Sequence, residues 1–457
     1  MALIDADSCI CTKAELELFE TKPTQTAITG GRLTAIHPTT SIDQTDVIEF
    51  STTTGEKDYL DLRESTIYIK AKIVKDDNTN LPEKVAGALN AAAQVYPINY
   101  PLASMFKQVE VLLNGKQIGS SSSLYPYRAM MEALLTHTED AKNHQLRCGG
   151  YFKDLSGMET TGATISDGTA ANKGAVNRFK MTKFSRSFEL EGRVHHEMFE
   201  QGKLLLSRVP ITVRLTLGNP KFILMSASDD TDYKIKLEKA IFYASVKEIA
   251  SYVRLAHEQR LLSANAKYPV SRIEMRYFHK AAGTDDLSET NLCKGEIPRR
   301  IVLGLIDGSA MTGALDKNPF NFKHFSVTSV KITVAGQQVP YGELKMDFAN
   351  KKVLNGYMTV FRGSKLWPSN QSNDITLEDY IDGHALYVFN LAPDDAGSSS
   401  FQLAKNGDVS VEIKTSAAPA NSVCIIALFE YDSFVEIDAD RNVHYAHNAA
   451  KQIEPRI

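Results

Sequence analysis

The chain has 457 residues, which exceeds the roughly 250–300 residues beyond which one hydrophobic core usually divides into domains. Its formal net charge is −4 and its pI is about 6.3, and this balance argues against a general electrostatic grip on nucleic acid. With 43% apolar and 23% charged residues the chain can build sizeable cores, which excludes a disordered protein.

Two further classes of protein are disfavoured by the sequence. No apolar run reaches the about 20 residues that a membrane-spanning helix needs, and the acidic N-terminus lacks the features of a signal peptide. We therefore expect a protein that is made in the cytosol and has no membrane span. The odd number and scattered positions of the cysteines predict reduced thiols and no disulfide framework; they are Cys9, Cys11, Cys148, Cys293 and Cys424.

Residues 1–45 predict an N-terminal arm without a core of its own. Leu16, Leu18 and Phe19 stand there among polar residues, which leaves too little apolar density for a packed domain. We predict that these three residues are assembly contacts, which dock on a neighbouring subunit or on an inner-shell protein. Acidic residues outnumber basic ones in this arm, so we do not expect it to gather a genome.

After the arm, short stretches with apolar residues at every second position predict β-strands. In STIYIKAKIV (65–74), for example, Ile67, Ile69 and Ile73 share one face. RRIVLGLID (299–307) lacks this alternation around its apolar centre and predicts a strand buried on both faces. About eight candidate strands in each half, separated by turn residues, indicate an all-β sandwich or barrel.

Helical patterns are few. Apolar stripes predict short helices over 125–140 and 251–265. The segment 149–177 is rich in Gly, Ala, Ser and Thr without periodicity, and we predict a long surface loop there.

Two pairs of segments indicate an internal duplication. VEVLLNGKQI (109–118) aligns without a gap with VKITVAGQQV (330–339), and AIFYASVKEI (240–249) resembles ALFEYDSFVEI (427–437). The duplication predicts two similar domains in tandem. The predicted boundaries are a first domain at 46–256, a linker at 257–269, a second domain at 270–440 and a C-terminal tail at 441–457.

The residue patterns that could carry chemistry are incomplete. RVHHEMFEQG contains His195, His196 and Glu200, but a cupin metal site requires H-x-H, and adjacent residues of a strand point to opposite faces. We predict surface or turn histidines instead of a metal site. EIDADRN (436–442) resembles a calcium loop but lacks its glycine and its bidentate glutamate, so we predict an acidic turn after the last strand.

No phosphate-binding loop or nucleophile elbow is present either. The sequence therefore predicts no catalytic, cofactor-binding or metal-binding residues and a protein that is not an enzyme.

Several motifs in a shared order resemble one family. They include CTKAELELFETKPTQTAI (11–28), SMFKQVEVLLNGKQI (104–118), NPFNFKH (318–324) and FEYDSFVEIDADRNV (429–443). The chain resembles the double jelly-roll major capsid proteins of the Polinton/Maverick–adintovirus group of double-stranded DNA viruses. The resemblance does not extend to the loops near 76–95 and 149–177, so it implies nothing about receptors.

This resemblance implies two tandem eight-stranded jelly rolls with few short helices. It also implies a homotrimer that forms a pseudo-hexameric capsomer, and neighbouring capsomers that build an icosahedral shell around a double-stranded DNA genome. The protein would be made in the host cytosol and located in the virion, with penton and minor or cement capsid proteins as partners and no sequence-specific nucleic-acid binding.

Two alternatives remain at the level of sequence. Jelly rolls also host lectins, so a carbohydrate- or receptor-binding virion protein is the first alternative. A double-cupin metalloenzyme is the second, and the histidine spacing disfavours it.

Overall fold

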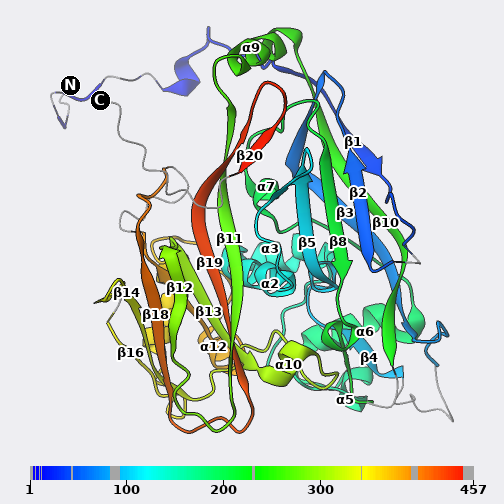
Figure 1. The fold of residues 1–457 in the computed structure, drawn as a ribbon, viewed down its shortest axis with the longest axis vertical. Coiled ribbons are helices and arrows are strands. Elements are labelled where there is room, and N and C mark those ends of the chain that lie inside the picture. The colour runs from blue at the N-terminus through cyan, green and yellow to red at the C-terminus, as the bar shows by residue number, and fades with distance from the viewer. Residues whose placement is uncertain are drawn as a thin grey trace.

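The computed structural model describes residues 4–5, 7–9, 11, 13–42, 45–82, 93–228, 232–340, 342–392 and 400–445. The chain is mostly β and forms two sandwiches that stand side by side (Figure 1). Each sandwich consists of two antiparallel sheets. Most of the helices lie between and below the two sandwiches.

The N-terminal sandwich contains two four-stranded sheets, with strand orders β1-β10-β3-β7 and β2-β8-β5-β6. These orders place strands that are distant in the sequence next to each other, as a jelly roll does. The strands are β1 (Ile28–Ile36), β10 (Tyr233–Ile249), β3 (Asp58–Lys75), β7 (Phe188–Gly192), β2 (Val47–Thr52), β8 (Ile211–Leu217), β5 (Phe106–Leu113) and β6 (Lys116–Ile118), and β4 (Val95–Pro97) pairs separately with β9 (Leu224–Ser226).

The C-terminal sandwich repeats this topology with the orders β11-β19-β13-β17 and β12-β18-β14-β15, to which β20 and β16 are added. Its strands are β11 (Ala266–Lys280), β19 (Val423–Ile437), β13 (Arg300–Asp307), β17 (Leu386–Asn390), β20 (Val443–Tyr445), β12 (Glu289–Glu296), β18 (Asn406–Thr415), β14 (Val327–Val334), β15 (Gln337–Gln338) and β16 (Leu344–Lys345). Strand for strand, β1 corresponds to β11, β10 to β19 and β5 to β14. The predicted fold of two tandem eight-stranded jelly rolls is confirmed.

The repeated sequence motifs occupy equivalent places in the two jelly rolls. VEVLLNGKQI forms the β5–β6 hairpin, and VKITVAGQQV forms the β14–β15 hairpin. Both turns use two residues of positive φ, Asn114 and Gly115 (47° and 75°) and Ala335 and Gly336 (48° and 80°), the turn type that matches the twist of a hairpin. The second pair of segments lies in β10 and β19, which occupy the same position in their sheets.

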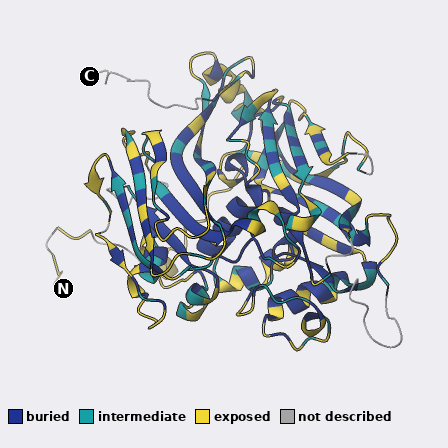
Figure 2. Cartoon of the chain, turned by 60° about the horizontal axis from the view of Figure 1, so that its bottom comes forward, coloured by how far each residue is buried: buried dark blue, intermediate teal, exposed yellow. Residues whose placement is uncertain are grey.

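Burial follows the predicted periodicity. In β3, Ile67, Ile69 and Ile73 are buried, whereas the intervening Lys70 and Lys72 are half-buried. Every residue of β13 except the first is buried, as expected for a strand covered on both faces. Figure 2 shows that the strands at the centre of the molecule are almost wholly buried, whereas buried and exposed residues alternate along the outer strands.

The helices lie mainly in two connections, which run from β6 to β7 and from β15 to β17. The predicted helices over 125–140 and 251–265 are present as α2 and α9. The helices are α1 (Pro101–Ser104), α2 (Tyr125–Thr136), α3 (Glu139–Asn143), α4 (Gln145–Cys148), α5 (Ala163–Ser166), α6 (Lys173–Thr182), α7 (Glu197–Glu200), α8 (Pro220–Ile223), α9 (Ser251–Leu261), α10 (Gly308–Thr312), α11 (Leu354–Gly363) and α12 (Leu377–Asp382), with short 3₁₀ turns at Ala14–Leu16 and Lys183–Ser185. None of the helices in the described parts of the chain is both long and apolar enough to cross a bilayer.

The prediction of a surface loop at 149–177 is wrong. The segment contains α5 and the first half of α6, and it packs against the C-terminal jelly roll. Asn318 Nδ2 donates to the carbonyl of Met158 over 3.2 Å, and Lys153 Nζ lies 2.8 Å from a carboxylate oxygen of Asp379. Small residues hide the helical period here, and the burial comes from contact with a distant part of the chain, which local pattern cannot reveal.

The predicted domain boundaries also need correction at three places. Residues 28–36 of the predicted arm form β1, whose backbone pairs with β10 although its side chains are mostly exposed. The predicted linker 257–269 contains the end of α9 and the start of β11, so only 262–265 lie between them. The predicted tail begins with the β19–β20 hairpin, and its residues 446–457 lie outside the described residues.

Candidate functional site

The three predicted assembly residues are among the most exposed large apolar side chains of the described arm, and only Ile4 is more exposed than all three. Leu16, Leu18 and Phe19 are 68%, 77% and 97% exposed, so they contribute nothing to either core. The arm passes α9 and leads away from the body of the molecule (Figure 1). Such exposure is costly in water and is consistent with residues that become covered by another surface. Their role in assembly stays a prediction.

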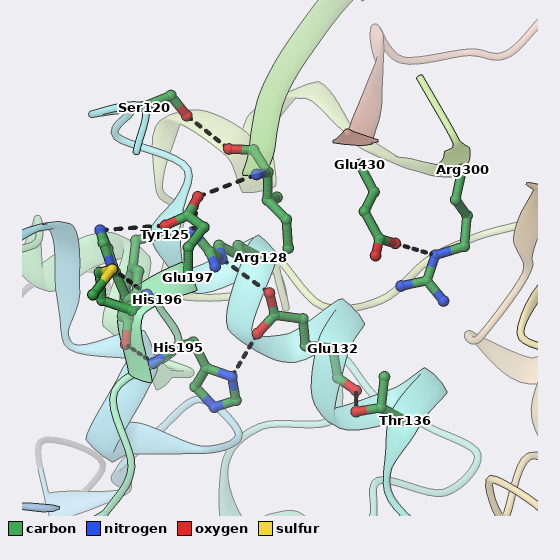
Figure 3. A network of polar contacts seen from close by, with 12 residues as sticks. Ser120, Tyr125, Arg128, Glu132, Thr136, His195, His196, Glu197, Arg300 and Glu430 are labelled. Carbon is green, nitrogen blue, oxygen red and sulfur yellow. Dashed lines mark hydrogen bonds and ion pairs between the residues drawn. The ribbon is translucent and has the colours of Figure 1, made fainter. Parts of the chain in front are cut away.

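The histidine pair lies in a buried polar cluster where the two jelly rolls meet (Figure 3). His195 Nδ1 donates to Glu132 Oε2 over 2.7 Å, and its Nε2 lies 2.9 Å from the hydroxyl of Tyr100. His196 Nε2 donates to the carbonyl of Ile118 over 3.0 Å. Both histidines are buried, at 7% and 4% exposure, so the prediction of surface histidines is wrong, whereas both do lie outside the strands, in the short connection from β7 to α7.

Arg128 stands at the centre of this cluster. Its Nε donates to Glu132 Oε1 over 2.9 Å within helix α2, and its Nη1 donates to Glu197 Oε1 over 3.2 Å. Burial alone would raise the pKa of Glu132, but the charge of Arg128 and the hydrogen bond from His195 lower it to about 2. The pKa of Glu197 is likewise lowered, because Arg128 and His196 outweigh the effect of burial.

The cluster joins the jelly rolls through one residue of β11. Glu197 Oε1 accepts the backbone N–H of Ile273 over 3.1 Å, and Ser120 Oγ donates to the carbonyl of Ile273 over 2.8 Å. Both backbone polar groups of Ile273, in the C-terminal jelly roll, are thus bonded by side chains of the N-terminal one. Since buried backbone groups must be paired, these two hydrogen bonds favour one position of β11 relative to the N-terminal jelly roll.

A second contact between the jelly rolls comes from the β19–β20 hairpin. The turn before β20 is the acidic stretch 436–442, in which Asp438 accepts the N–H of Asn442 over 2.8 Å. Arg441 in this turn is buried and donates from Nε to the carbonyl of Ser207 over 3.0 Å, and its Nη2 pairs with Glu258 of α9. The prediction that this stretch follows the last strand is therefore wrong, because β20 comes after it.

Glu132, His195 and Glu200 place one ligand atom each within 4.8 Å of one another, which is close enough for a metal ion. The donor set fits a cation poorly, because the Arg128 guanidinium already bonds Glu132 and both nitrogens of His195 are engaged. Packing around the carboxyl and the neighbouring Glu132 raise the pKa of Glu200 to about 8. Because the Glu200 side chain is exposed to solvent, we expect its raised pKa to change the stability of the fold only modestly. The contacts of Arg128 and Tyr100 thus disfavour a metal, and the absence of a metal site stays a prediction.

Sequence reasoning missed Arg128 and Glu132 as members of this cluster. The signal was available, since two opposite charges four residues apart interrupt the apolar stripe of 125–136. Their partners His195 and Glu197 could not be found by spacing, because they lie beyond β7, 63 and 69 residues further along the chain than Glu132 and Arg128.

The cluster predicts a specific dependence of stability on pH. The ordinary pKa of Glu132 is 4.5 and its folded pKa is about 2, so its contribution is present above pH 4.5 and is lost as the pH falls toward 2. The Glu132→Gln variant should therefore have a lower melting temperature than the parent at pH 7. The difference between the two melting temperatures should narrow as the pH falls from 4.5 to 3. Thermal unfolding followed by circular dichroism measures the difference. Glu56→Gln, in an exposed ion pair with Arg208, is the control for which the difference should be small throughout.

The comparisons with known proteins support the fold. No family model matches the chain. An uncharacterized protein of Caenorhabditis elegans is 26% identical over 427 residues, which cover 92% of this chain and 98% of that protein.

Solved structures of viral shells are similar over almost the whole length. A chain of the Sputnik virophage structure has a TM-score of 0.65 at 12% identity and covers 100% of this chain and 97% of its own. The Faustovirus major capsid protein has a TM-score of 0.56 at 10% identity, with 92% of each chain covered. A chain of the PBCV-1 virus capsid has a TM-score of 0.54 at 10% identity and covers 94% of this chain and 100% of its own. Together with the strand orders, these likenesses show that the chain has the double jelly-roll fold found in major capsid proteins of large double-stranded DNA viruses and virophages.

Proposed function

We propose that the chain is a major capsid protein whose function is carried by protein–protein interfaces. Three copies would form a pseudo-hexameric capsomer, and many capsomers would tile an icosahedral shell around a double-stranded DNA genome. The observation that carries this proposal is the duplication itself, two jelly rolls of equivalent strand order joined in one chain. Six similar domains from three chains give a six-cornered unit, which packs against six neighbours in a flat lattice.

The buried junction between the jelly rolls supports the same proposal. A subunit that supplies two adjacent corners of a ring must hold them at a constant angle, and buried ion pairs and hydrogen bonds around Arg128 and Glu197 link the two jelly rolls. The exposed edge strand β1 is a further supporting feature, because its open backbone groups and Leu33, 66% exposed, favour coverage by another subunit.

The finer parts of the proposal rest on the motifs of the sequence. We infer a place in the Polinton/Maverick–adintovirus group, a location in the virion after synthesis in the host cytosol, and penton and minor or cement capsid proteins as partners. The role is structural and includes no catalytic step, no cofactor and no sequence-specific nucleic-acid binding.

Light scattering on the purified full chain tests the proposal. We expect a species of three times 50.5 kDa, and hexagonal particles by negative-stain electron microscopy. A monomer or dimer that binds a glycan array would support a lectin and contradict the proposal, and so would a protein that retains one metal ion per chain.

The predicted arm contacts are tested by Phe19→Ala. A fully exposed aromatic side chain that becomes buried at an interface contributes about 2–4 kcal/mol there, so we expect the yield of assembled particles to fall at least tenfold. Thr21→Ala, a polar residue two positions away, is the matched control. An unchanged yield of particles for Phe19→Ala would contradict the role of the arm in assembly.

A further inference from the structure

A groove lies beside α9, where the two jelly rolls and the base of the arm come together. It has a volume of about 540 Å³ and lies between α9, the start of β11 and residues 203–206. Its floor is apolar and consists of Tyr59, Leu204, Leu206, Val253, Leu261 and Tyr268. We call it the α9 groove.

The rim of the α9 groove is positively charged. Lys203, Arg260 and Lys267 line it, and no Asp or Glu is among its described lining residues. Lys267 is partly compensated by Glu436 at 3.4 Å, whereas Arg260 has no carboxylate within ion-pair distance among the residues that the structure describes. The groove therefore fits a segment that combines apolar side chains with negative charge.

The arm is such a segment. Residues 13–22 read KAELELFETK, so three glutamates surround Leu16, Leu18 and Phe19. These apolar side chains are exposed, and the glutamates Glu15, Glu17 and Glu20 are exposed with them. Apolar side chains would contact the floor of the groove while the glutamates face its basic rim.

The C-terminal end of the arm lies at the α9 groove of its own chain. The apolar side chains of the arm do not fill this groove, because they are exposed. Ala27 and Ile28 line the groove, and the hydroxyls of Thr26 and Tyr252 are 2.8 Å apart, which fixes the base of the arm on α9. From there the arm leads away from the body (Figure 1). The stretch from Phe19 to Thr26 can span roughly 25 Å when extended, which is enough to reach an adjacent copy.

We propose that the α9 groove of one copy binds the arm of a second copy, with Leu16, Leu18 and Phe19 on its floor and glutamates of the arm paired with Arg260 and Lys203. The inference deepens the proposed function and rests on it, since adjacent copies must meet in an assembly. In such an exchange, each copy would insert its arm into the α9 groove of a second copy and bind the arm of another copy in its own groove.

A photo-crosslink tests the proposal on the full chain. Phe19 is replaced by p-benzoylphenylalanine, and ¹⁴N- and ¹⁵N-labelled chains are mixed before assembly and irradiation. Mass spectrometry should find crosslinks to peptides with residues 203–206, 253–261 or 266–268, and a large share of the linked pairs should combine a ¹⁴N peptide with a ¹⁵N peptide. Crosslinks within one isotope only, or crosslinks that map elsewhere, would overturn the proposal. Light scattering on the same sample reports the trimer separately, so a failure of the proposed function is recognised as such.

Charge reversal supplies a second test. Arg260→Glu and Glu17→Arg should each lower the yield of the intermolecular crosslink about fivefold, as expected for the loss of one exposed ion pair at an interface. The two changes together should restore most of the yield. Arg208→Glu, on the surface outside the groove, is the matched control and should leave the yield unchanged. Single variants without effect, or a pair of changes that does not restore the yield, would overturn the proposed charge pairing.

Discussion

Replacing Glu197 by alanine is expected to lower the free energy of unfolding by about 3–5 kcal/mol, the usual cost of removing one partner from a buried ion pair. Glu197 is 1% exposed, and its carboxylate faces Arg128 at 3.2 Å and the backbone N–H of Ile273 at 3.1 Å. The variant leaves a buried guanidinium with one carboxylate partner fewer and a buried amide without an acceptor. Both defects lie at the junction of the jelly rolls, so we expect the domains to lose their fixed relation.

Two measurements separate this effect from a general loss of stability. Denaturant titration gives the change in free energy, and hydrogen exchange should show faster exchange of the Ile273 amide than of amides in the centre of β13. Glu56→Ala removes an exposed partner of Arg208, and we expect it to cost less than 1 kcal/mol, as is typical of surface ion pairs. A cost for Glu197→Ala as small as that of this control would mean that the cluster does not hold the jelly rolls together.

The fate of the neighbouring histidines shows how far the sequence could be interpreted. Opposite directions were expected for His195 and His196 as neighbours in a strand, but both lie in the connection from β7 to α7, where one contacts Glu132 and the other Ile118. Their burial was not predicted, because it depends on α2 and β11, which come from other parts of the chain. Local pattern predicted strand faces well, as in β3, since these depend on the period of one element.

The errors at 149–177 and at β1 concern contacts between distant segments. Residues 149–177 were expected to form a surface loop because Gly, Ala and Thr dominate them, yet Ile165 and Val176 are buried. Similarly, β1 was assigned to the arm because residues 1–45 have too little apolar density for a core, and backbone hydrogen bonds to β10 place it in the sheet. Hydrogen bonds between main chains leave no signature in the side chains, so the sequence could not reveal this strand.

The segment 149–177 also leads to the second large effect, which we expect at Arg178 in α6. This side chain has no exposed surface; its Nη2 donates to Asp154 over 2.8 Å and its Nε donates to the carbonyl of Pro97 over 3.0 Å. Arg178→Met should cost about 3–5 kcal/mol, because Asp154, which is also buried, loses its cationic partner.

The double variant Arg178→Met/Asp154→Asn distinguishes an unpaired charge from a simple loss of packing. Removing the charge of Asp154 as well should recover part of the lost free energy, since a neutral amide can still accept the hydrogen bond that Asn172 Nδ2 now donates to Asp154 Oδ1 over 2.9 Å. Arg186→Met, at an exposed position of the same connection, should change the free energy of unfolding by less than 0.5 kcal/mol or so. If Arg178→Met were tolerated as well as Arg186→Met, the connection from β6 to β7 would behave as the surface loop that its composition suggests. The expected loss instead means that this connection is part of the core on which the junction between the jelly rolls is built.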